Sequence, residues 1–310
     1  MKWLVIVNKK AGGGSAGGLW ISTENSLIAA GIDYTARFTE APAQTRLIAS
    51  NALNFGFDGI AVFGGDGTIS DAAAAISPMI EKPVLAFLPA GSGNDWMRSM
   101  GCVPVSMDSC IKAIASEKTK LIDSGMCVWP GGSRFFLNSA GVGFDALVLK
   151  RTVAGRRFLP FNQPGYLLTL AVSALFPPHW RATVYCDGKP FYKGDYLTIT
   201  TGVGRYSGGG MLLSPCAAPD DGFLDTLCLS PMNFFSIAGN FSRIFDGTLH
   251  KTKWATGARG KVIRIEHATE SSIILELDGE IVVPGVSPDY IEFISRPEDL
   301  LVIDSFSESH

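Results

Sequence analysis

The chain has 310 residues, of which 46% are hydrophobic and 18% are charged, and its formal net charge is −3. This length allows two domains of ordinary size, each with a substantial core. The weakly acidic composition argues against a nucleic-acid partner, because such proteins carry broad basic surfaces. The most apolar stretch, Tyr166–Phe176, covers 11 positions, which is too short to cross a bilayer.

The six cysteines are irregularly spaced and form no Cys-x-x-Cys pair. The spacing therefore predicts neither a zinc site nor a disulfide framework. Reduced thiols are typical of cytoplasmic proteins, and we expect that compartment for this chain.

From Lys2 to about Asp123, short apolar segments alternate with helical ones. The apolar segments are hydrophobic throughout rather than at every second residue, which indicates strands buried on both faces of a parallel sheet. This pattern predicts an α/β domain over residues 1–123, with functional loops at the carboxyl ends of its strands. The predicted strands are Trp3–Val7, Tyr34–Phe38, Gly59–Phe63 and Pro83–Leu88, and the predicted helices are Leu19–Ala30, Pro42–Asn54, Thr68–Ile76 and Met107–Ala115.

Two glycine-rich loops follow neighbouring strands of this predicted sheet. The first, Gly64–Thr68, contains three glycines around Asp66 and leads into an alanine-rich helix. Glycines let main-chain N–H groups approach an anion closely, and the N-terminus of the helix would add a positive dipole end. The second loop, Pro89–Asp95, follows the next strand. Together the loops predict a phosphate site with a carboxylate available to a metal ion.

After Asp123 the sequence becomes rich in strands, with frequent Gly, Pro and Asp at turns. This half predicts a second domain, residues 124–290, built as an antiparallel β-sandwich. Helical segments are expected at about residues 147–176, with a break near Pro160–Pro164, and at Asn233–Phe245. The predicted strands are Arg134–Ala140, Arg181–Cys186, Tyr196–Gly202, Leu224–Leu229, Val262–Glu266 and Ser272–Leu277.

The glycines at residues 12–17 also match the motifs of other protein classes. They fit a dinucleotide-binding fingerprint, with Glu40 beyond the second strand. However, the distance from Val7 to Gly12 is too long for that tight turn, and the loops at Asp66 and Ser92 would stay unexplained. The same residues imitate the nucleophile elbow of hydrolases, but none of the four histidines lies in a triad context. A Walker-A pattern is absent, so a nucleotide would need another architecture.

Several segments together resemble the catalytic domain of the diacylglycerol kinase family, which includes bacterial diacylglycerol kinases, sphingosine kinases and ceramide kinases. The resemblance spans nearly the whole chain, although Lys9 replaces the proline usual in the family. It implies an NAD-kinase-like first domain, to which residues 291–310 would return. The matching segments are Val7–Gly12, Gly64–Thr68, Gly91–Asp95 with Arg98, Gly208–Met211, Asp221–Asp225 and Asp278–Glu280.

This resemblance implies a kinase that uses ATP and Mg²⁺ to phosphorylate a lipid hydroxyl. On pattern alone Asp220–Gly222 and Asp278–Glu280 are hairpin turns. The family adds roles: Asp221, with the carbonyls of Ala218 and Phe223, would hold a structural Mg²⁺, and the proton acceptor would be Glu280, Asp278 or Asp66, with Glu280 favoured. Nucleotide contacts are implied for Asn8, Gly12, Thr39, Gly65, Asp66, Gly67, Thr68, Ile69, Ser70, Asp71, Gly91, Ser92, Asn94, Asp95 and Arg98.

Alternatives stay open at this point. Asp95 and Arg98 could form a structural ion pair rather than serve the nucleotide. A kinase of a soluble acceptor such as NAD shares the first glycine loop, whereas the matches in the second domain favour lipid. A nucleotide-binding protein without activity is the third reading, and a homodimer is one arrangement that the sequence allows.

Peripheral contact with a membrane is a further expectation. Lys150, Arg151, Arg156 and Arg157 precede the apolar run Phe158–Phe161, and the stretch Tyr166–Phe176 follows. Basic residues beside aromatic ones suit contact with anionic lipid headgroups. The alternative is a helical hairpin whose apolar face belongs to the core.

Overall fold

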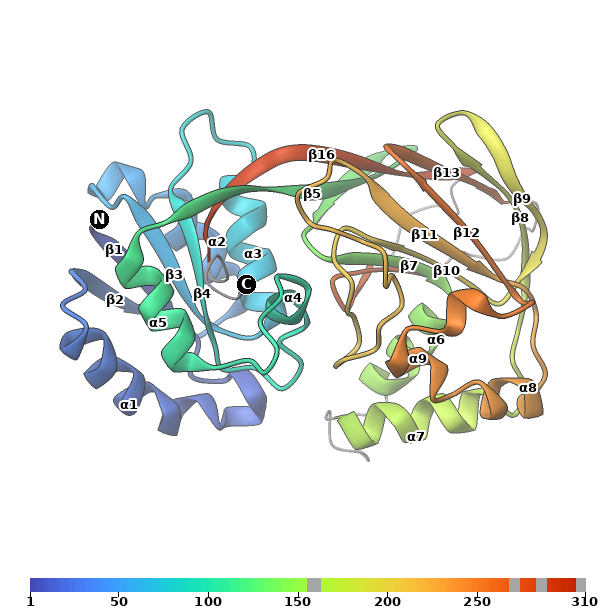
Figure 1. The fold of residues 1–310 in the computed structure, drawn as a ribbon, viewed down its shortest axis with the longest axis horizontal. Helices are drawn as coiled ribbons and strands as arrows, with labels where there is room; N and C mark the ends of the chain where they lie inside the picture. Colours follow the sequence, from blue (N-terminus) through green and yellow to red (C-terminus); the bar gives the residue numbers. More distant parts are fainter. Residues whose placement is uncertain (155–162, 268–273, 283–288, 305–310) are drawn as a thin grey trace. The chain divides into compact units, whose positions relative to one another are not determined.

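The computed structural model describes residues 1–154, 163–267, 274–282 and 289–304 (Figure 1). The chain divides into two compact units. The first unit consists of Met1–Asp123 together with the segment from Pro297 onward, and the second consists of Ser124–Arg296. The apolar run Phe158–Phe161 and its neighbours Arg156 and Arg157 lie outside the described residues.

The first unit is built on a parallel sheet. Its strands are β1 (Trp3–Val7), β2 (Tyr34–Phe38), β3 (Gly59–Gly64) and β4 (Val84–Pro89), in the order β2-β1-β3-β4. β1, β3 and β4 are buried at every residue, as their continuous apolarity predicts. Because β1 has β2 on one side and β3 on the other, the order reverses there. Ligands of open α/β sheets bind at such a reversal, beyond the carboxyl ends of the strands.

Helices complete the first unit (Figure 1). The helices α1 and α3 begin three and two residues earlier than predicted, because both have glycine in the first turn, which is a poor helix former. The helix α4, five residues long, was not predicted. The bounds are α1 (Ala16–Ala29), α2 (Pro42–Ser50), α3 (Asp66–Ile76), α4 (Asp95–Ser99) and α5 (Met107–Ser116), with a 3₁₀ turn at Ala11–Gly14.

The long strand β16 (Tyr290–Ile303) brings the end of the described chain into the first unit. Its residue Val302 pairs in parallel with Leu85 of β4. The buried carboxylate of Asp299 accepts hydrogen bonds from Oγ of Ser77 at 2.6 Å and from Nζ of Lys82 at 2.9 Å. The sheet of the first unit is therefore completed by a distant part of the sequence.

The second unit contains antiparallel strands in two sheets. One sheet joins the first half of β16 to β13, β8 and β9, with β5 and β6 alongside, and the other runs β12-β11-β10-β7-β14-β15. Side chains of both sheets, among them Phe136, Phe293, Ile199 and Leu224, share one buried core. The bounds are β5 (Thr119–Trp129), β6 (Gly132–Phe136), β7 (Ser139–Gly143), β8 (Trp180–Cys186), β9 (Lys189–Tyr196), β10 (Thr198–Gly202), β11 (Leu224–Leu229), β12 (Ala255–Gly260), β13 (Val262–His267), β14 (Leu275–Leu277) and β15 (Glu280–Val282).

Short helices cover one face of the second sheet (Figure 1). They are α6 (Phe144–Ala154), α7 (Gln163–Ser173), α8 (Phe234–Gly239) and α9 (Arg243–Asp246). A second apolar cluster joins them to the sheet through residues such as Leu170, Leu227 and Ile237. Among the described residues, none of the helices is long and apolar enough to span a membrane.

Candidate functional site

The loops after β1, β3 and β4 meet at the carboxyl edge of the parallel sheet. A Cβ added to Gly12 would stand 2.8 Å from the carbonyl oxygen of Ala90, and one added to Gly91 would stand 2.6 Å from Cα of Gly65. Both distances are shorter than any real contact of a Cβ, so only glycine allows the loops to approach this closely. The three predicted glycine positions Gly12, Gly65 and Gly91 are thus brought together.

Asn8 links the first loop to the helix after β3. Its Nδ2 donates to Oγ1 of Thr68 at 3.0 Å, and its Oδ1 accepts from the main-chain N–H of Lys10 at 3.1 Å. Thr39, at the end of β2, is buried and donates its main-chain N–H to the carbonyl of Val7 at 2.9 Å. Asn8, Thr39 and Thr68 therefore lie at the ends of three adjacent strands.

Asp66 connects the first glycine loop to the second. It is the first residue of α3, and its Oδ1 accepts the main-chain N–H of Trp96 at 3.0 Å. The surrounding protein removes water from this carboxylate and raises its pKa, while main-chain hydrogen bonds from Asn94, Asp95 and Trp96 act in the opposite direction. The carboxylate thus faces the start of α4, which the sequence could not show.

The second loop is closed by the side chain of Asn94, whose backbone is left-handed with φ of 51°. Its Oδ1 accepts from the N–H of Gly91 at 3.2 Å, and its Nδ2 donates to the carbonyl of Gly91 at 3.0 Å. Nε of Arg98 donates to the carbonyl of Gly93 at 3.1 Å and lies 4.0 Å from Oδ1 of Asp95. Arg98 therefore fastens the loop through the main chain and pairs only loosely with Asp95. Ser92 is exposed between these contacts.

The remaining predicted nucleotide residues lie along α3. Gly67 is exposed in its first turn, whereas Ile69 is buried in the core. Asp71 accepts a hydrogen bond from Nε of Arg46 on α2 at 2.7 Å. Ser70 lies between them and is partly buried. Ile69 and Asp71 thus have contacts within the fold, and the first turn of α3 is the part that faces outward.

In the second unit, Asp278 and Glu280 have different surroundings. The carboxylate of Asp278 accepts the main-chain N–H groups of Leu137 at 2.7 Å, Asn138 at 2.8 Å and Ser139 at 3.1 Å. These donors lie where the chain leaves β6 and enters β7 of the other sheet. Glu280 is exposed and forms an ion pair with Arg134. Asp278 therefore stabilises the turn, and Glu280 is the more exposed of the two carboxylates.

An arginine side chain from β12 contacts the turn that is expected to hold a structural Mg²⁺. Oδ1 of Asp221 accepts the N–H of Phe223 at 2.9 Å, and Oδ2 accepts a hydrogen bond from Nη2 of Arg259. Nε of Arg259 also lies 3.7 Å from Oδ2 of Asp225. Ala218 is partly buried in the same turn. A guanidinium already contacts the carboxylate of Asp221, so these residues as arranged do not fit a Mg²⁺ ion.

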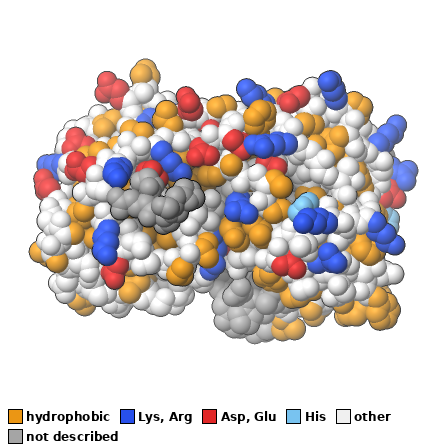
Figure 2. All heavy atoms as spheres, in the orientation of Figure 1, with side chains coloured by type: hydrophobic (Ala, Val, Ile, Leu, Met, Phe, Trp, Pro, Cys, Tyr) orange, Lys and Arg blue, Asp and Glu red, His pale blue; other side chains and the backbone are white. Residues whose placement is uncertain are grey.

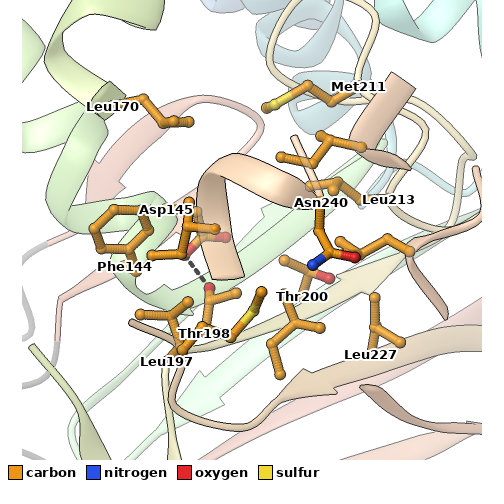
Figure 3. A pocket seen from close by; sticks show the side chains of 15 residues that line it. Phe144, Asp145, Leu170, Leu197, Thr198, Thr200, Met211, Leu213, Leu227 and Asn240 are labelled. Atoms are coloured by element: carbon orange, nitrogen blue, oxygen red, sulfur yellow. Dashed lines mark hydrogen bonds between the residues drawn. The ribbon is translucent and has the colours of Figure 1, made fainter. Parts of the chain in front are cut away.

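An apolar pocket of about 680 Å³, counting its part open to solvent, lies between the second sheet and its helices (Figure 3). Leucines, isoleucines, methionines and Phe144 make up most of its wall, and Asp145 is the acidic residue that lines it. Oδ1 of Asp145 accepts a hydrogen bond from Oγ1 of Thr198 at 2.6 Å, as the dashed line shows. The pocket was not predicted, because its lining comes from segments far apart in the sequence. The one local signal was a carboxylate inside an apolar helix, at Phe144-Asp145.

Asp145 has a second carboxylate as a neighbour. A Cβ added to Gly141 would stand 2.2 Å from Oδ2 of Asp145 and 3.1 Å from Oε1 of Glu276, so both side chains share the space above this glycine. Loss of water raises the pKa of Asp145 and, more strongly, that of Glu276, whose pKa the charge of Asp145 raises further. Burial and the closeness of the two carboxylates therefore raise the pKa of both groups.

Comparison with known proteins identifies the family. Residues 2–127 match the family model of the diacylglycerol kinase catalytic domain, and residues 138–303 match that of the YegS C-terminal NAD kinase beta sandwich-like domain. A Pseudomonas syringae pv. tomato protein named "Probable lipid kinase YegS-like" is 29% identical over 275 residues, which cover 88% of this chain and 84% of that protein. A Pseudomonas putida protein of the same name is 30% identical over 242 residues, covering 78% of this chain and 76% of its own.

Solved structures show the same fold. The crystal structure of a Bacillus anthracis diacylglycerol kinase matches with a TM-score of 0.71 at 22% identity and covers 97% of this chain and 96% of that chain. Both units of the chain therefore have the architecture expected from the sequence, a parallel α/β unit followed by an antiparallel β unit. The chain belongs to the lipid kinase family that joins a diacylglycerol kinase catalytic domain to a YegS-type C-terminal domain.

Proposed function

We propose that the protein transfers the γ-phosphoryl group of ATP to the hydroxyl group of a membrane lipid. The observation that carries this proposal is the apolar pocket of the second unit, which a kinase of a polar, soluble acceptor would not need. Its wall is mostly apolar, with a few polar side chains, as is common for small-molecule sites. Hydrocarbon chains suit its wall, and a polar group suits Asp145 and Thr198.

The nucleotide would bind at the loops of the first unit. Gly65 and Gly91 leave no side chain between the two loops, and the 11-residue helix α3 points its N-terminal N–H groups toward the same edge. Phosphoryl transfer depends on positioning and on neutralising charge, which these N–H groups support. A Mg²⁺ ion that arrives with ATP would supply further positive charge, and Asp66 and Asp95 are the carboxylates nearest to these loops.

The acceptor hydroxyl would meet Glu280 as its general base. Glu280 is exposed, and Arg134 holds its carboxylate in one direction. A general base must reach the proton it removes and must be ionised beforehand. Asp278 is less suited, because three main-chain N–H groups already occupy its oxygens.

The lipid would come from a bilayer that contacts α7 and α8. Leu170 on α7 faces the pocket, whereas Leu168 and Val172 on the same helix are exposed. Leu175 and Phe176, just after α7, and Phe235 on α8 are exposed as well. Figure 2 shows hydrophobic side chains gathered along the edge of the second unit where these two helices lie. Single exposed apolar residues are common, but a helix that is apolar on both sides needs a second apolar neighbour.

Basic side chains near α7 also favour a lipid surface as the second apolar neighbour of this helix. Nη1 of Arg151 on α6 donates to Oγ of Ser173 on α7 at 2.9 Å, which places a guanidinium against the exposed helix. Lys150 precedes it and is exposed. Cations beside an exposed apolar helix are typical of proteins that contact anionic headgroups.

A panel of acceptors tests the proposed reaction. The purified protein would be incubated with γ-labelled ATP and Mg²⁺ and with diacylglycerol, monoacylglycerol, a sphingoid base, an isoprenoid alcohol or NAD. We expect labelled product in the organic phase with at least one lipid. Label on NAD alone would replace the lipid proposal by that of a soluble acceptor, and no transfer to any acceptor would contradict kinase activity on these classes.

The membrane contact has its own test. Phe176→Ser combined with Phe235→Ser should weaken sedimentation with vesicles of phosphatidylglycerol and phosphatidylcholine, and lower activity on lipid in the bilayer. Activity on a short-chain lipid in solution should stay unchanged. Phe55→Ser is a matched control, because Phe55 is 70% exposed but lies in the first unit. Equal losses in Phe55→Ser, or equal losses on bilayer lipid and on soluble lipid, would contradict the proposed membrane contact of α7 and α8.

A further inference from the structure

Arg259 lies close to two carboxylates, those of Asp221 and Asp225. It stands on β12 directly opposite Asp225 on β11, so the two side chains project from the same face of the sheet. Nη2 of Arg259 donates to Oδ2 of Asp221, and Nε lies 3.7 Å from Oδ2 of Asp225. That oxygen of Asp225 is buried and accepts no hydrogen bond from the described residues. Arg259 is therefore the cation next to both acids: it is hydrogen-bonded to Asp221, and its charge partly offsets the burial that raises the pKa of Asp225.

An aromatic ring fixes the guanidinium from a third direction. Cζ of Arg259 lies 5.0 Å from the centre of the Phe223 ring, and Nζ of Lys261 lies 5.8 Å from the same ring. Cations are attracted to the face of such a ring. The main chain of Phe223 also donates to Oδ1 of Asp221 at 2.9 Å. Phe223 thus contacts the acid through its backbone and the base through its side chain.

A Mg²⁺ ion would compete with this arrangement. Mg²⁺ binds carboxylate oxygens at about 2.0–2.1 Å and requires near-octahedral geometry. A guanidinium that already contacts the carboxylate of Asp221 would then lie within a few ångströms of a divalent ion, and the two cations would repel each other. Arg259 would have to move away from Asp221 and Asp225 before the metal could bind.

We propose that Arg259 is the structural cation of the turn Ala218–Asp225 and takes the place of the Mg²⁺ ion that the family resemblance implies there. The guanidinium joins β12 to the turn before β11 through two acids and one ring. The stability of the second unit then depends on Arg259 and is independent of Mg²⁺. This inference does not depend on the identity of the lipid or on catalysis.

Thermal unfolding of the nucleotide-free protein provides the test. Melting would be followed by circular dichroism in EDTA and in 10 mM MgCl₂ at equal ionic strength. We expect the Tm of the unaltered protein to be the same in both buffers and Arg259→Gln to lower it by several degrees. Arg181→Gln is the matched control, because Arg181 forms an exposed ion pair with Asp195 at 2.6 Å in the other sheet and such pairs contribute little.

Two results would overturn the proposal. One is a Tm that rises with Mg²⁺ in the unaltered protein but not in Asp221→Asn. The other is a loss of Tm in Arg259→Gln no larger than that in Arg181→Gln. If Arg259→Gln does not fold, calorimetric titration of MgCl₂ into the unaltered protein decides the question. Saturable binding that Asp221→Asn removes would contradict the proposal, and no saturable binding would support it.

Discussion

At the scale of single residues, Asp66 illustrates what a motif predicts and what it omits. The run of glycines around it predicted a loop between a strand and a helix, and Asp66 is in fact the first residue of α3, two residues after β3 ends. Its hydrogen bond to Trp96 was not predictable, because that partner lies 30 residues away on α4. The charge and the hydrogen bond of Asp66 are therefore separable by mutation.

Asp66→Asn should reduce lipid phosphorylation by about 10²-fold or more, because it removes a negative charge from the phosphate site. Tm should change little, since the amide oxygen still accepts the N–H of Trp96. Asp66→Ala, which loses both functions, should lower Tm as well. Steady-state kinetics and thermal melts on both variants check this, and near-normal turnover of the Asn variant would refute the role of the charge.

Glu280→Gln should mainly lower activity, whereas Asp278→Asn should mainly lower stability. Loss of the proposed base should lower kcat by roughly 10²–10⁴-fold at unchanged ATP affinity and unchanged Tm. Asp278→Asn should mainly destabilise the protein, because an amide accepts the three N–H groups of residues 137–139 less well than a carboxylate does. Kinetics, ATP titration and melting would separate the two. Weaker ATP binding in Glu280→Gln would assign it to the nucleotide instead.

At the scale of elements, the sequence predicted best where burial is uniform. Strands β1, β3 and β4 were placed almost to the residue, since both faces of each strand are covered. The predicted strand Arg134–Ala140 is in fact β6 and β7 in different sheets. Its interruption depends on the distant carboxylate of Asp278, and no local signal marks it. The polar strand β9 was missed because only part of it is buried.

The contact of α6 with β14 predicts a pH dependence. Because the pKa values of Asp145 and Glu276 are raised on folding, the native state binds more protons than the unfolded chain above the ordinary carboxyl pKa of about 4. Stability should therefore fall as pH rises above about 4. Glu276→Gln keeps an acceptor for the N–H of Gly279 and removes one charge. Its Tm should exceed that of the unaltered protein at pH 8, with a smaller difference at pH 5; the reverse trend would contradict the shared environment.

At the scale of the whole molecule, composition and periodicity predicted an α/β unit followed by a β-rich unit. They could not predict the pocket, whose wall combines α6, α7, α8 and strands β10 and β11. Apolar residues at these positions are compatible with an ordinary filled core. Only the packing of the helices over the sheet leaves the space between them empty.

A larger side chain in the pocket should impair phosphorylation of the lipid but leave ATP binding unaffected. Leu227→Trp places a larger side chain in the pocket and should reduce kcat/KM for lipid by about tenfold or more, with ATP affinity unchanged. Leu121→Trp is the control, since Leu121 is exposed on β5. Activities on lipid and nucleotide titrations of both variants check this. Normal lipid kinetics in folded Leu227→Trp would exclude the pocket as the acceptor site.

The return of β16 to the first unit has a consequence for biosynthesis. When residues 1–123 leave the ribosome, the edge of β4 has no neighbour, and Ser77 and Lys82 lack the carboxylate of Asp299. An uncovered strand edge can pair with another chain and cause aggregation. The second unit is continuous in sequence, so it can finish folding first, and the nascent first unit must remain protected until the residues after 297 have emerged.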